Sequence, residues 1–515
     1  MKLPSSSLLL LLLTALPPSS TGQSAPRVVC FYENWARYRP PLGRFLPTNI
    51  PPHLCTHIHY VGAGVHAETL RVGPLDVFAD IVTGGYRSTV ELREHNPDLK
   101  VLTMIGGSGQ QQDSLRAAAA TAESRKQLAE AAVEFLREHD FDGLDVDWKP
   151  PHAPEDHAGL LEALRAAFDR DTTSTGRRRL LLAVELTPHP DELREHFDME
   201  RVTAAVDYAN VLGYRYQVTE RSVTSHHAPL RTPPGAPADA AGRDILTTLE
   251  TLKQMGADMA KLNLAVPTFG MSFTLEDPRL AGLYASSSGP GAAGPITRAK
   301  GSLATYEICD KTGRRGWTAA RPFPQDVGPY AAGEDQIVAF DDETSLMMKA
   351  RMAREAGLGG VAVWTVSLDD FRGFCTGEPF PMIRALKAGM LGIDESGLPT
   401  TPVPPTTPAY DASDIFVCPS DGKHAASDCE HFYLCSGGQP ELFSCKEGET
   451  YDEELRACRP GGRCTPQPAA RVAGFGPTPT PTQSPAPSAG GRRRRPLTPR
   501  RRGPSAGPIS FYTFG

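Results

Sequence analysis

Residues 141–150 read FDGLDVDWKP, and this stretch decides the fold assignment. Successive side chains of a β-strand point to opposite faces, so Asp145, Asp147 and Lys149 share one face. Burying several charged side chains is costly unless they are paired or solvated, which predicts a functional site on this face. The alternative is a structural charge cluster in which Lys149 neutralises Asp147.

Seven other short apolar stretches have the character of this strand, and helical patterns separate several of them. The eight predicted strands are Arg27–Tyr32, Cys55–Gly62, Lys100–Gly106, Phe141–Asp147, Leu180–Leu186, Tyr208–Tyr214, Leu262–Thr268 and Gly360–Val366. Helical spacing of apolar residues occurs in Glu123–Asp140, Glu155–Arg170 and Ser345–Ala356. Strands that alternate with helices in this way predict an α/β fold, a (β/α)₈ TIM barrel, with a doubly wound open sheet as the alternative.

The first 22 residues predict a signal peptide, 1–22. Lys2 precedes an unbroken leucine run, Leu8–Leu13, and the small residues Ser20 and Gly22 suit signal-peptidase cleavage. The run is too short to span a bilayer, and no later stretch reaches the roughly 18 apolar residues that a membrane helix needs. We therefore expect a secreted, extracellular protein with no membrane partner.

The ten cysteines divide into two groups. Four are widely spaced, and six lie between Cys418 and Cys464 with the spacing C-x10-C-x5-C-x9-C-x12-C-x5-C. The dense group predicts a small disulfide-rich β module at 414–465. A zinc site is the alternative, but no C-x2-C pair occurs and a secreted protein meets an oxidising environment.

Composition separates the barrel region, 23–395, from the C-terminal part of the chain. Residues 398–410 read LPTTPVPPTTPAY and predict an extended Pro/Thr linker at 396–413. Residues 466–515 hold eight arginines and no acidic residue, and they predict a disordered basic tail rich in Pro, Ser and Arg. We interpret this tail as a solvated segment, so no nucleic-acid partner is expected.

The stretch at 141–150 resembles the DGxDxDxE signature of glycoside hydrolase family 18, the chitinases and chitinase-like lectins. Six further places resemble motifs of that family in chain order. They are Val29–Trp35, Leu54–His57, Ile105–Gly107, Leu212–Tyr214, Pro267–Gly270 and Gly359–Phe371. The resemblance implies that the long gap between the seventh and eighth strands holds an α+β insertion subdomain at about 270–350.

The resemblance implies that the barrel has the fold of a glycoside hydrolase but lacks the residue that this family uses as its proton donor. Family members cleave β-1,4-linked N-acetylglucosamine polymers by a substrate-assisted route, in which the last glutamate of the signature protonates the leaving oxygen. Asp142, Asp145 and Asp147 match the signature, but Lys149 stands where that glutamate is expected. The pKa of an unperturbed lysine is about six units higher than that of a glutamate, so lysine is a poor proton donor at neutral pH. At about 4 Å, the positive charge of lysine would also destabilise the positively charged, oxocarbenium-like transition state by on the order of 4 kcal/mol. Hydrolysis is therefore expected to be lost.

The resemblance also implies which residues contact sugar. These substrate-binding residues are Tyr32, Trp35, Gly106, Gly107, Asp147, Tyr214, Arg215 and Trp364. Sugar rings stack on aromatic faces, so the aromatic members are expected platforms, with ordinary barrel packing as the alternative for each. Arg215 follows Tyr214 where the family usually has aspartate, which makes a second basic site position. We expect neither a cofactor nor a metal.

The cysteine module has a resemblance of its own. Its spacing, with FYLC at Phe432–Cys435, resembles the peritrophin-A type of chitin-binding domain. Spacing alone leaves the cysteine connectivity open, but the two resemblances imply five disulfides. These are Cys30–Cys55, Cys309–Cys375, Cys418–Cys435, Cys429–Cys464 and Cys445–Cys458. Phe432, Tyr433 and Tyr451 are candidate chitin contacts, and packing in the module core is the alternative for Phe432 and Tyr433.

Three functions are compatible with the sequence. The leading hypothesis is a chitinase-like protein that binds chitin or related N-acetylglucosamine glycans without hydrolysing them. The second is a weakly active chitinase, because burial can shift a lysine pKa toward neutrality. The third is a non-catalytic signalling or structural protein. The sequence does not determine the oligomeric state.

Overall fold

The chain forms two compact units, and a computed structural model describes most of the first and part of the second. The described residues are 25–107, 109–149, 151, 153–217, 222–394, 422–425, 431–436, 439–445, 450–452 and 455–460. The predicted signal peptide, linker and basic tail lie outside these residues and stay predictions.

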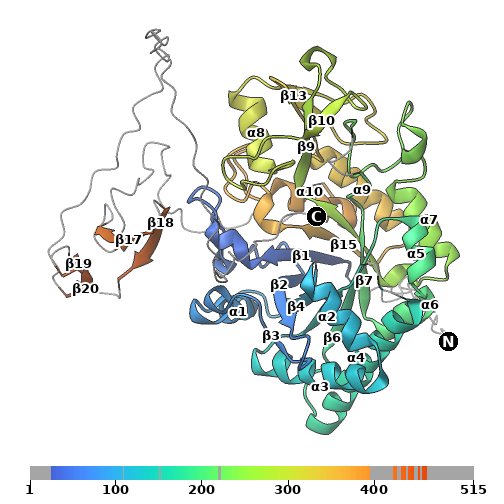
Figure 1. Cartoon of the computed structure of the whole chain (residues 1–515), viewed down its shortest axis with the longest axis vertical. Helices are drawn as coiled ribbons and strands as arrows, with labels where there is room; N and C mark the ends of the chain where they lie inside the picture. Colours follow the sequence, from blue (N-terminus) through green and yellow to red (C-terminus); the bar gives the residue numbers. More distant parts are fainter. Residues whose placement is uncertain are drawn as a thin grey trace, which may run out of the picture. The chain divides into compact units, whose positions relative to one another are not determined.

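Eight parallel strands close into a barrel in the first unit (Figure 1). They are β1 (Arg27–Glu33), β2 (His57–Val65), β4 (Lys100–Gly106), β5 (Gly143–Asp147), β6 (Leu181–Leu186), β7 (Tyr208–Leu212), β8 (Leu262–Pro267) and β15 (Gly360–Trp364). Their order is β1-β15-β8-β7-β6-β5-β4-β2, and the pairing of β1 with β2 closes the ring. Strand β3 (Val72–Pro74) adds to β2 in antiparallel fashion. The predicted (β/α)₈ barrel is therefore confirmed, and the open-sheet alternative is excluded.

Helices alternate with these strands on the outside of the barrel (Figure 1). They are α1 (Gly85–Val90), α2 (Gln110–Ala119), α3 (Ala122–Glu138), α4 (Pro154–Thr175), α5 (Pro190–His196), α6 (Met199–Ala205), α7 (Ile245–Gln254), α9 (Glu343–Glu355) and α10 (Pro381–Leu391). Helix α3 shows why they form. The Thr121 hydroxyl caps its first turn by accepting from the Ser124 N–H, and its apolar face, including Leu128 and Phe135, is buried.

Strand β5 carries the charged face of residues 141–150 into the barrel. Leu144 and Val146 are fully buried in the apolar core. Asp145 instead hydrogen-bonds to His59 of β2, which is not a neighbouring strand. Side chains of non-neighbouring strands meet only across the barrel interior, so the charged face points inward as the alternation predicts.

The long segment between β8 and β15 folds as an α+β insertion. Its strands are β9 (Phe269–Leu275), β10 (Ser287–Pro290), β11 (Ser302–Ala304), β12 (Thr318–Ala320), β13 (Tyr330–Gly333) and β14 (Gln336–Ala339), and its helix is α8 (Thr305–Arg314). The strands form one antiparallel sheet in the order β10-β9-β14-β13-β12, with β11 also paired to β9. Small apolar clusters around Trp317 and Phe273 hold this subdomain together.

The second unit contains two small antiparallel sheets. Strands β16 (Gly422–Ala425), β17 (His431–Ser436) and β18 (Gln439–Ser444) form one, and β19 (Thr450–Asp452) and β20 (Ala457–Arg459) form the other. Such short sheets enclose little apolar area, so covalent cross-links matter for their stability.

Disulfides link three of the five expected cysteine pairs. They are Cys30–Cys55, Cys309–Cys375 and Cys445–Cys458. The other two expected pairs, Cys418–Cys435 and Cys429–Cys464, involve cysteines outside the described residues. Within the described part of the chain, the helices are all too short or too polar to cross a bilayer.

Candidate functional site

An ion pair occupies the end of strand β5 at the C-terminal mouth of the barrel. The Lys149 ammonium contacts the Asp147 carboxylate directly. The two side chains are 18% and 11% exposed, so the pair is mostly buried but still reaches solvent. The alternative interpretation of the sequence, in which Lys149 neutralises Asp147, is therefore the arrangement in the structure.

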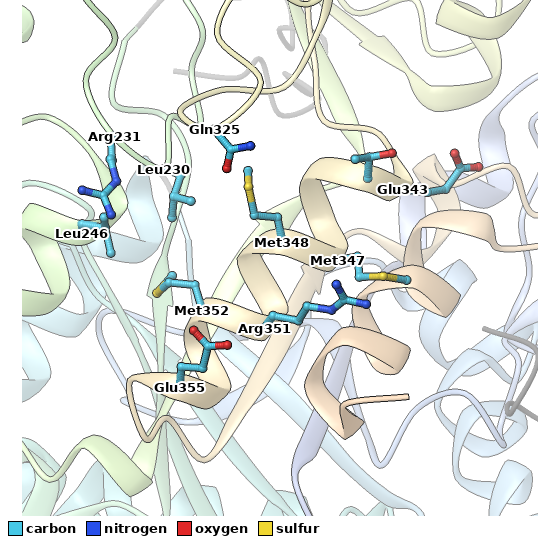
Figure 2. A pocket seen from close by; sticks show the side chains of 11 residues that line it. Leu230, Arg231, Leu246, Gln325, Glu343, Met347, Met348, Arg351, Met352 and Glu355 are labelled. Carbon is cyan, nitrogen blue, oxygen red and sulfur yellow. The ribbon is translucent and has the colours of Figure 1, made fainter. Parts of the chain in front are cut away.

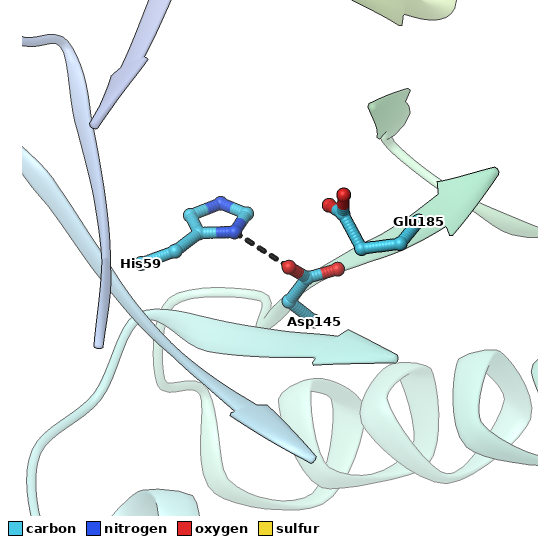
Figure 3. A group of neighbouring side chains, drawn as sticks. All are labelled: His59, Asp145 and Glu185. Atoms are coloured by element: carbon cyan, nitrogen blue, oxygen red, sulfur yellow. Dashed lines mark hydrogen bonds and ion pairs between the residues drawn. The ribbon is translucent and has the colours of Figure 1, made fainter. Parts of the chain in front are cut away.

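A second group of polar side chains lies deeper in the barrel, below this pair. His59 of β2 and Asp145 of β5 face Glu185 of β6, and all three side chains are essentially buried (Figure 3). The His59 Nδ1 atom lies 2.7 Å from Asp145 Oδ2, and its Nε2 atom lies 2.7 Å from the Tyr208 hydroxyl. Burial lowers the pKa of His59 to about 3, so the ring is neutral and one nitrogen carries the proton.

Amide side chains continue the network from Glu185 toward the other end of the barrel. Asn210 Nδ2 donates to Glu185 Oε1 at 2.7 Å, and Asn263 Nδ2 donates to Asn210 Oδ1 at 2.8 Å. Arg27 Nε in turn donates to Asn263 Oδ1 at 2.8 Å. Three strands thus hold the Glu185 carboxylate in one orientation.

The two deep carboxyl groups have strongly perturbed pKa values. Burial, and then repulsion from Asp147, raises the pKa of Asp145 to about 7. Burial, and then repulsion from Asp145, raises the pKa of Glu185 well above its usual value. A carboxylate in a low-dielectric interior is unstable without a compensating positive charge, and this is the physical cause of both shifts.

Comparison with known proteins identifies both units. Residues 27–369 match the family described as Glycosyl hydrolases family 18, and residues 418–464 match the Chitin binding Peritrophin-A domain. The chain belongs to glycosyl hydrolase family 18. Both resemblances seen in the sequence are thereby confirmed.

Relatives of this family 18 chain are named as chitinases and as chitinase-like proteins. Mouse Chitotriosidase-1 is 30% identical over 455 residues, which cover 84% of this chain and 95% of the mouse protein. Human Chitinase-3-like protein 2 is 31% identical over 374 residues, which cover 72% of this chain and 94% of the human protein.

Solved structures of the family include both kinds of protein. Ostrinia furnacalis Group II chitinase catalytic domain 2 superposes with a TM-score of 0.66 at 31% identity, covering 72% of this chain and 97% of that domain. Human YKL-39, described as a pseudo-chitinase with retained chitooligosaccharide binding properties, gives 0.66 at 31% identity and covers 72% and 100%.

The two glycines expected at the site of this family 18 barrel allow β4 to approach β5 closely. A Cβ atom on Gly106 would lie 2.1 Å from the Asp147 carbonyl oxygen, and its φ of +100° also disfavours other residues. The Gly107 N–H donates to the same oxygen at 2.9 Å. Both glycines therefore position Asp147.

The expected aromatic platforms divide into two groups. Trp35 and Trp364 are partly buried and pack against the core, so part of each ring remains accessible. Tyr214 is 4% exposed and Tyr32 only 1%. The structure corrects the expectation for Tyr32, because its ring packs against Tyr60 at 5.4 Å between centroids and has no face left for a sugar. Arg215 is partly buried beside Tyr214.

Asp142 does not join the other acidic residues of the signature. It precedes the first residue of β5 and therefore lies at the N-terminal end of the barrel, opposite the mouth. Its carboxylate accepts from the Val101 N–H at 2.9 Å and from Arg93 Nη1 at 3.2 Å. Its role is to fasten adjacent strands at that end, which corrects its placement in the site.

In the chitin-binding module, Tyr451 is fully buried and stacks on Phe432, with 4.9 Å between ring centroids and 17° between planes. Packing is therefore the role of Tyr451, which corrects the expectation of a sugar contact. Phe432 is partly buried, with the Lys423 ammonium 5.2 Å from its ring centroid. The side chain of Tyr433 lies outside the described residues.

A large cavity of about 750 Å³ lies elsewhere, on the outside of the barrel (Figure 2). It is lined by α9 residues that include Met347, Met348 and Met352, and by Leu230 and Leu246. None of the residues expected to bind sugar lines it. The mouth of the barrel, not this cavity, therefore remains the candidate functional site.

Sequence reasoning missed His59 and Glu185. Glu185 is a single carboxylate in the otherwise apolar segment LLAVEL, and His59 lies in the apolar segment HIHYVGAGV. A polar, ionisable residue inside a buried strand is a signal that could have drawn attention to each. Their proximity to Asp145 could not have been read from one strand alone.

Proposed function

We propose that the chain is a secreted chitinase-like protein that binds chitin or related N-acetylglucosamine glycans without hydrolysing them at an enzymatic rate. The Lys149–Asp147 ion pair at the barrel mouth is the observation that carries this proposal. Family membership and the peritrophin-A domain support the class of ligand. The predicted signal peptide supports secretion.

The ion pair opposes the family's chemistry in two ways. General acid catalysis needs a proton donor matched to neutral pH at the leaving oxygen, and its loss typically costs about 10²- to 10⁴-fold in rate. The Lys149 ammonium also adds positive charge where positive charge develops on the sugar. In addition, it engages the carboxylate of Asp147, which the family resemblance assigns to sugar binding.

Hydrolysis of a fluorogenic chitotrioside tests the catalytic part of the proposal. We expect the wild-type rate to stay near that of the blank and Lys149→Glu to raise it by about 10²-fold or more, because the variant regains a carboxylic acid. Wild-type activity equal to that of the Glu variant would overturn the proposal.

Binding of soluble chitooligosaccharides to the full chain tests the ligand part. Trp364 is partly exposed at the C-terminal end of β15, and its loss should weaken binding by about 3- to 10-fold if it stacks on a sugar ring. Calorimetry on wild type and Trp364→Ala, with matching far-UV circular dichroism, gives this ratio. Equal affinities would show that Trp364 does not contribute to binding.

A weakly active chitinase is the second candidate, because relatives such as mouse Chitotriosidase-1 are named as chitinases. In that case wild-type turnover would exceed the blank, and Asp147→Ala would abolish it. Retention of the same slow turnover in Asp147→Ala would assign it to a contaminating enzyme.

A further inference from the structure

The deep cluster brings three metal-ligating side chains together from three different strands. One ligand atom each of His59, Asp145 and Glu185 lies within 4.8 Å of the other two. None of the three residues is more than 2% exposed, and Figure 3 shows the two carboxylates and the imidazole facing a common space. Exposed acidic clusters are common on proteins, but a fully buried one requires an explanation.

This cluster contains two carboxyl groups and no ammonium or guanidinium group. Asp145 and Glu185 supply the two carboxyl groups, and His59 supplies an imidazole. The nearby cation Lys149 is already paired with Asp147. Among the described residues, no hydrogen bond of good geometry reaches the fully buried Asp145 Oδ1, although the Glu185 carboxyl and the Val146 N–H lie close to the Asp145 carboxyl group. An ion with two positive charges would displace the proton that the two buried carboxyl groups otherwise hold, and it would balance the charge of both.

The surrounding hydrogen bonds are those of an outer coordination shell. If His59 binds a metal through Nδ1, its Nε2–H donates to the Tyr208 hydroxyl, 2.7 Å away. Asn210 donates to Glu185 Oε1 and is itself held by Asn263. Metal-binding histidines and carboxylates are typically oriented by such partners.

We propose that His59, Asp145 and Glu185 bind one divalent transition-metal ion inside the barrel, with Zn²⁺ as the best-matched probe. One imidazole nitrogen and two carboxylate oxygens suit Zn²⁺, whereas Ca²⁺ and Mg²⁺ prefer shells of oxygen alone. Binding through His59 Nδ1 replaces the hydrogen bond that this atom makes to Asp145 Oδ2, which is now 2.7 Å long. Three protein ligands leave one position for water.

Zinc binding to the untagged full chain after EDTA treatment tests the proposal. Calorimetry and metal analysis should show one more bound Zn²⁺ in wild type than in Glu185→Gln, which keeps the side-chain shape but removes a charged ligand. Glu162→Gln is the matched control, because Glu162 pairs with Arg201 at the surface and should keep the ion. Asn210→Ala, which changes only the outer shell, should weaken binding by about 10- to 100-fold.

Cobalt substitution provides a readout that does not depend on any variant folding. Wild type loaded with Co²⁺ should show the visible absorption of a low-coordinate site with a nitrogen ligand. Absence of a tight ion in wild type, or equal stoichiometry in wild type and Glu185→Gln, would overturn the proposal, and the carboxylates would then share a proton. Glycan binding is measured separately, so failure here leaves the proposed function standing.

Discussion

The barrel interior holds acidic residues in two layers, at the mouth and deeper inside, and their negative charge is compensated differently in each layer. At the mouth, the Asp147 carboxylate is paired with the Lys149 ammonium within reach of solvent. Two residues earlier on the same strand, Asp145 is fully buried beside a neutral His59 and a second carboxylate, Glu185. A long cationic side chain can compensate charge near the surface because its ammonium remains partly hydrated. The deeper layer must instead take up a proton or an ion.

This difference separates what each layer can do. In the mouth layer, the two charged groups contact each other and remain within reach of solvent. The deep layer is organised by hydrogen bonds to Tyr208 and Asn210 but is closed to a sugar. Variants that alter one layer at a time can therefore test the comparison.

We expect the His59→Leu substitution to cause the largest loss in the free energy of unfolding. This change leaves the Asp145 carboxyl and the Tyr208 hydroxyl without their partner, and each buried unsatisfied group costs about 1–3 kcal/mol. We expect a loss of about 2–5 kcal/mol in the free energy of unfolding, measured with urea at pH 7.5. A loss below about 1 kcal/mol would show that the deep hydrogen bonds do not organise the barrel.

Glu185→Gln should stabilise the metal-free protein, with an effect that depends on pH. The raised pKa of Glu185 means that the native state holds a proton that the unfolded state loses above about pH 4.5. Wild-type stability therefore falls as pH rises from that value, and the variant escapes this loss. We expect a gain of about 1–3 kcal/mol at pH 8 and a smaller gain at pH 5.

Urea unfolding in EDTA at both pH values measures this difference. Glu162→Gln is again the control, because a hydrogen bond from Arg201 lowers the pKa of Glu162 and gives the opposite, much smaller dependence. A gain for Glu185→Gln that does not grow with pH would contradict the charge imbalance of the deep layer.

Lys149→Met should have a smaller effect, because the mouth pair is partly hydrated. We expect a loss of about 1 kcal/mol in the free energy of unfolding, reduced by added salt. Lys126→Met, which removes an exposed helix pair with Glu130, is the matched control and should change stability by less than about 0.5 kcal/mol. Equal losses in the two variants would place the mouth pair among ordinary surface pairs.

The smallest effect at neutral pH is expected for His157→Leu. His157 of α4 is as buried as His59, but neither of its ring nitrogens has a hydrogen-bond partner in the described chain. Leucine has a similar volume, so stability at pH 7.5 should change by less than about 1 kcal/mol. A loss as large as that of His59→Leu would mean that packing, not hydrogen bonding, explains both.

Acidic pH should reveal a further effect of His157→Leu on stability. Burial lowers the pKa of His157 to about 3, so the unfolded state takes up a proton below about pH 6.5 that the native state does not. Wild type therefore loses stability as pH falls through this range, and His157→Leu does not. At pH 5 the variant should be more stable than wild type by about 2 kcal/mol, measured by urea unfolding.

The local sequence pattern was sufficient to predict the barrel architecture and the pair of charged residues at the barrel mouth. All eight predicted strand segments overlap the observed barrel strands, because a buried parallel strand needs a continuous apolar run that is visible in a few residues. The alternation within residues 141–150 also places Asp147 and Lys149 on one face, and the two are adjacent in the structure. Their contact depends only on positions two residues apart.

Only the tertiary structure decided the rest. Closure of the barrel brings β2, β5 and β6 together, so His59, Asp145 and Glu185 meet although 126 positions separate the first from the last. It also decides burial, which leaves Tyr32 almost without exposed surface. A sequence specifies which faces are apolar or charged, but the distance between faces on different strands exists only once the sheet has closed.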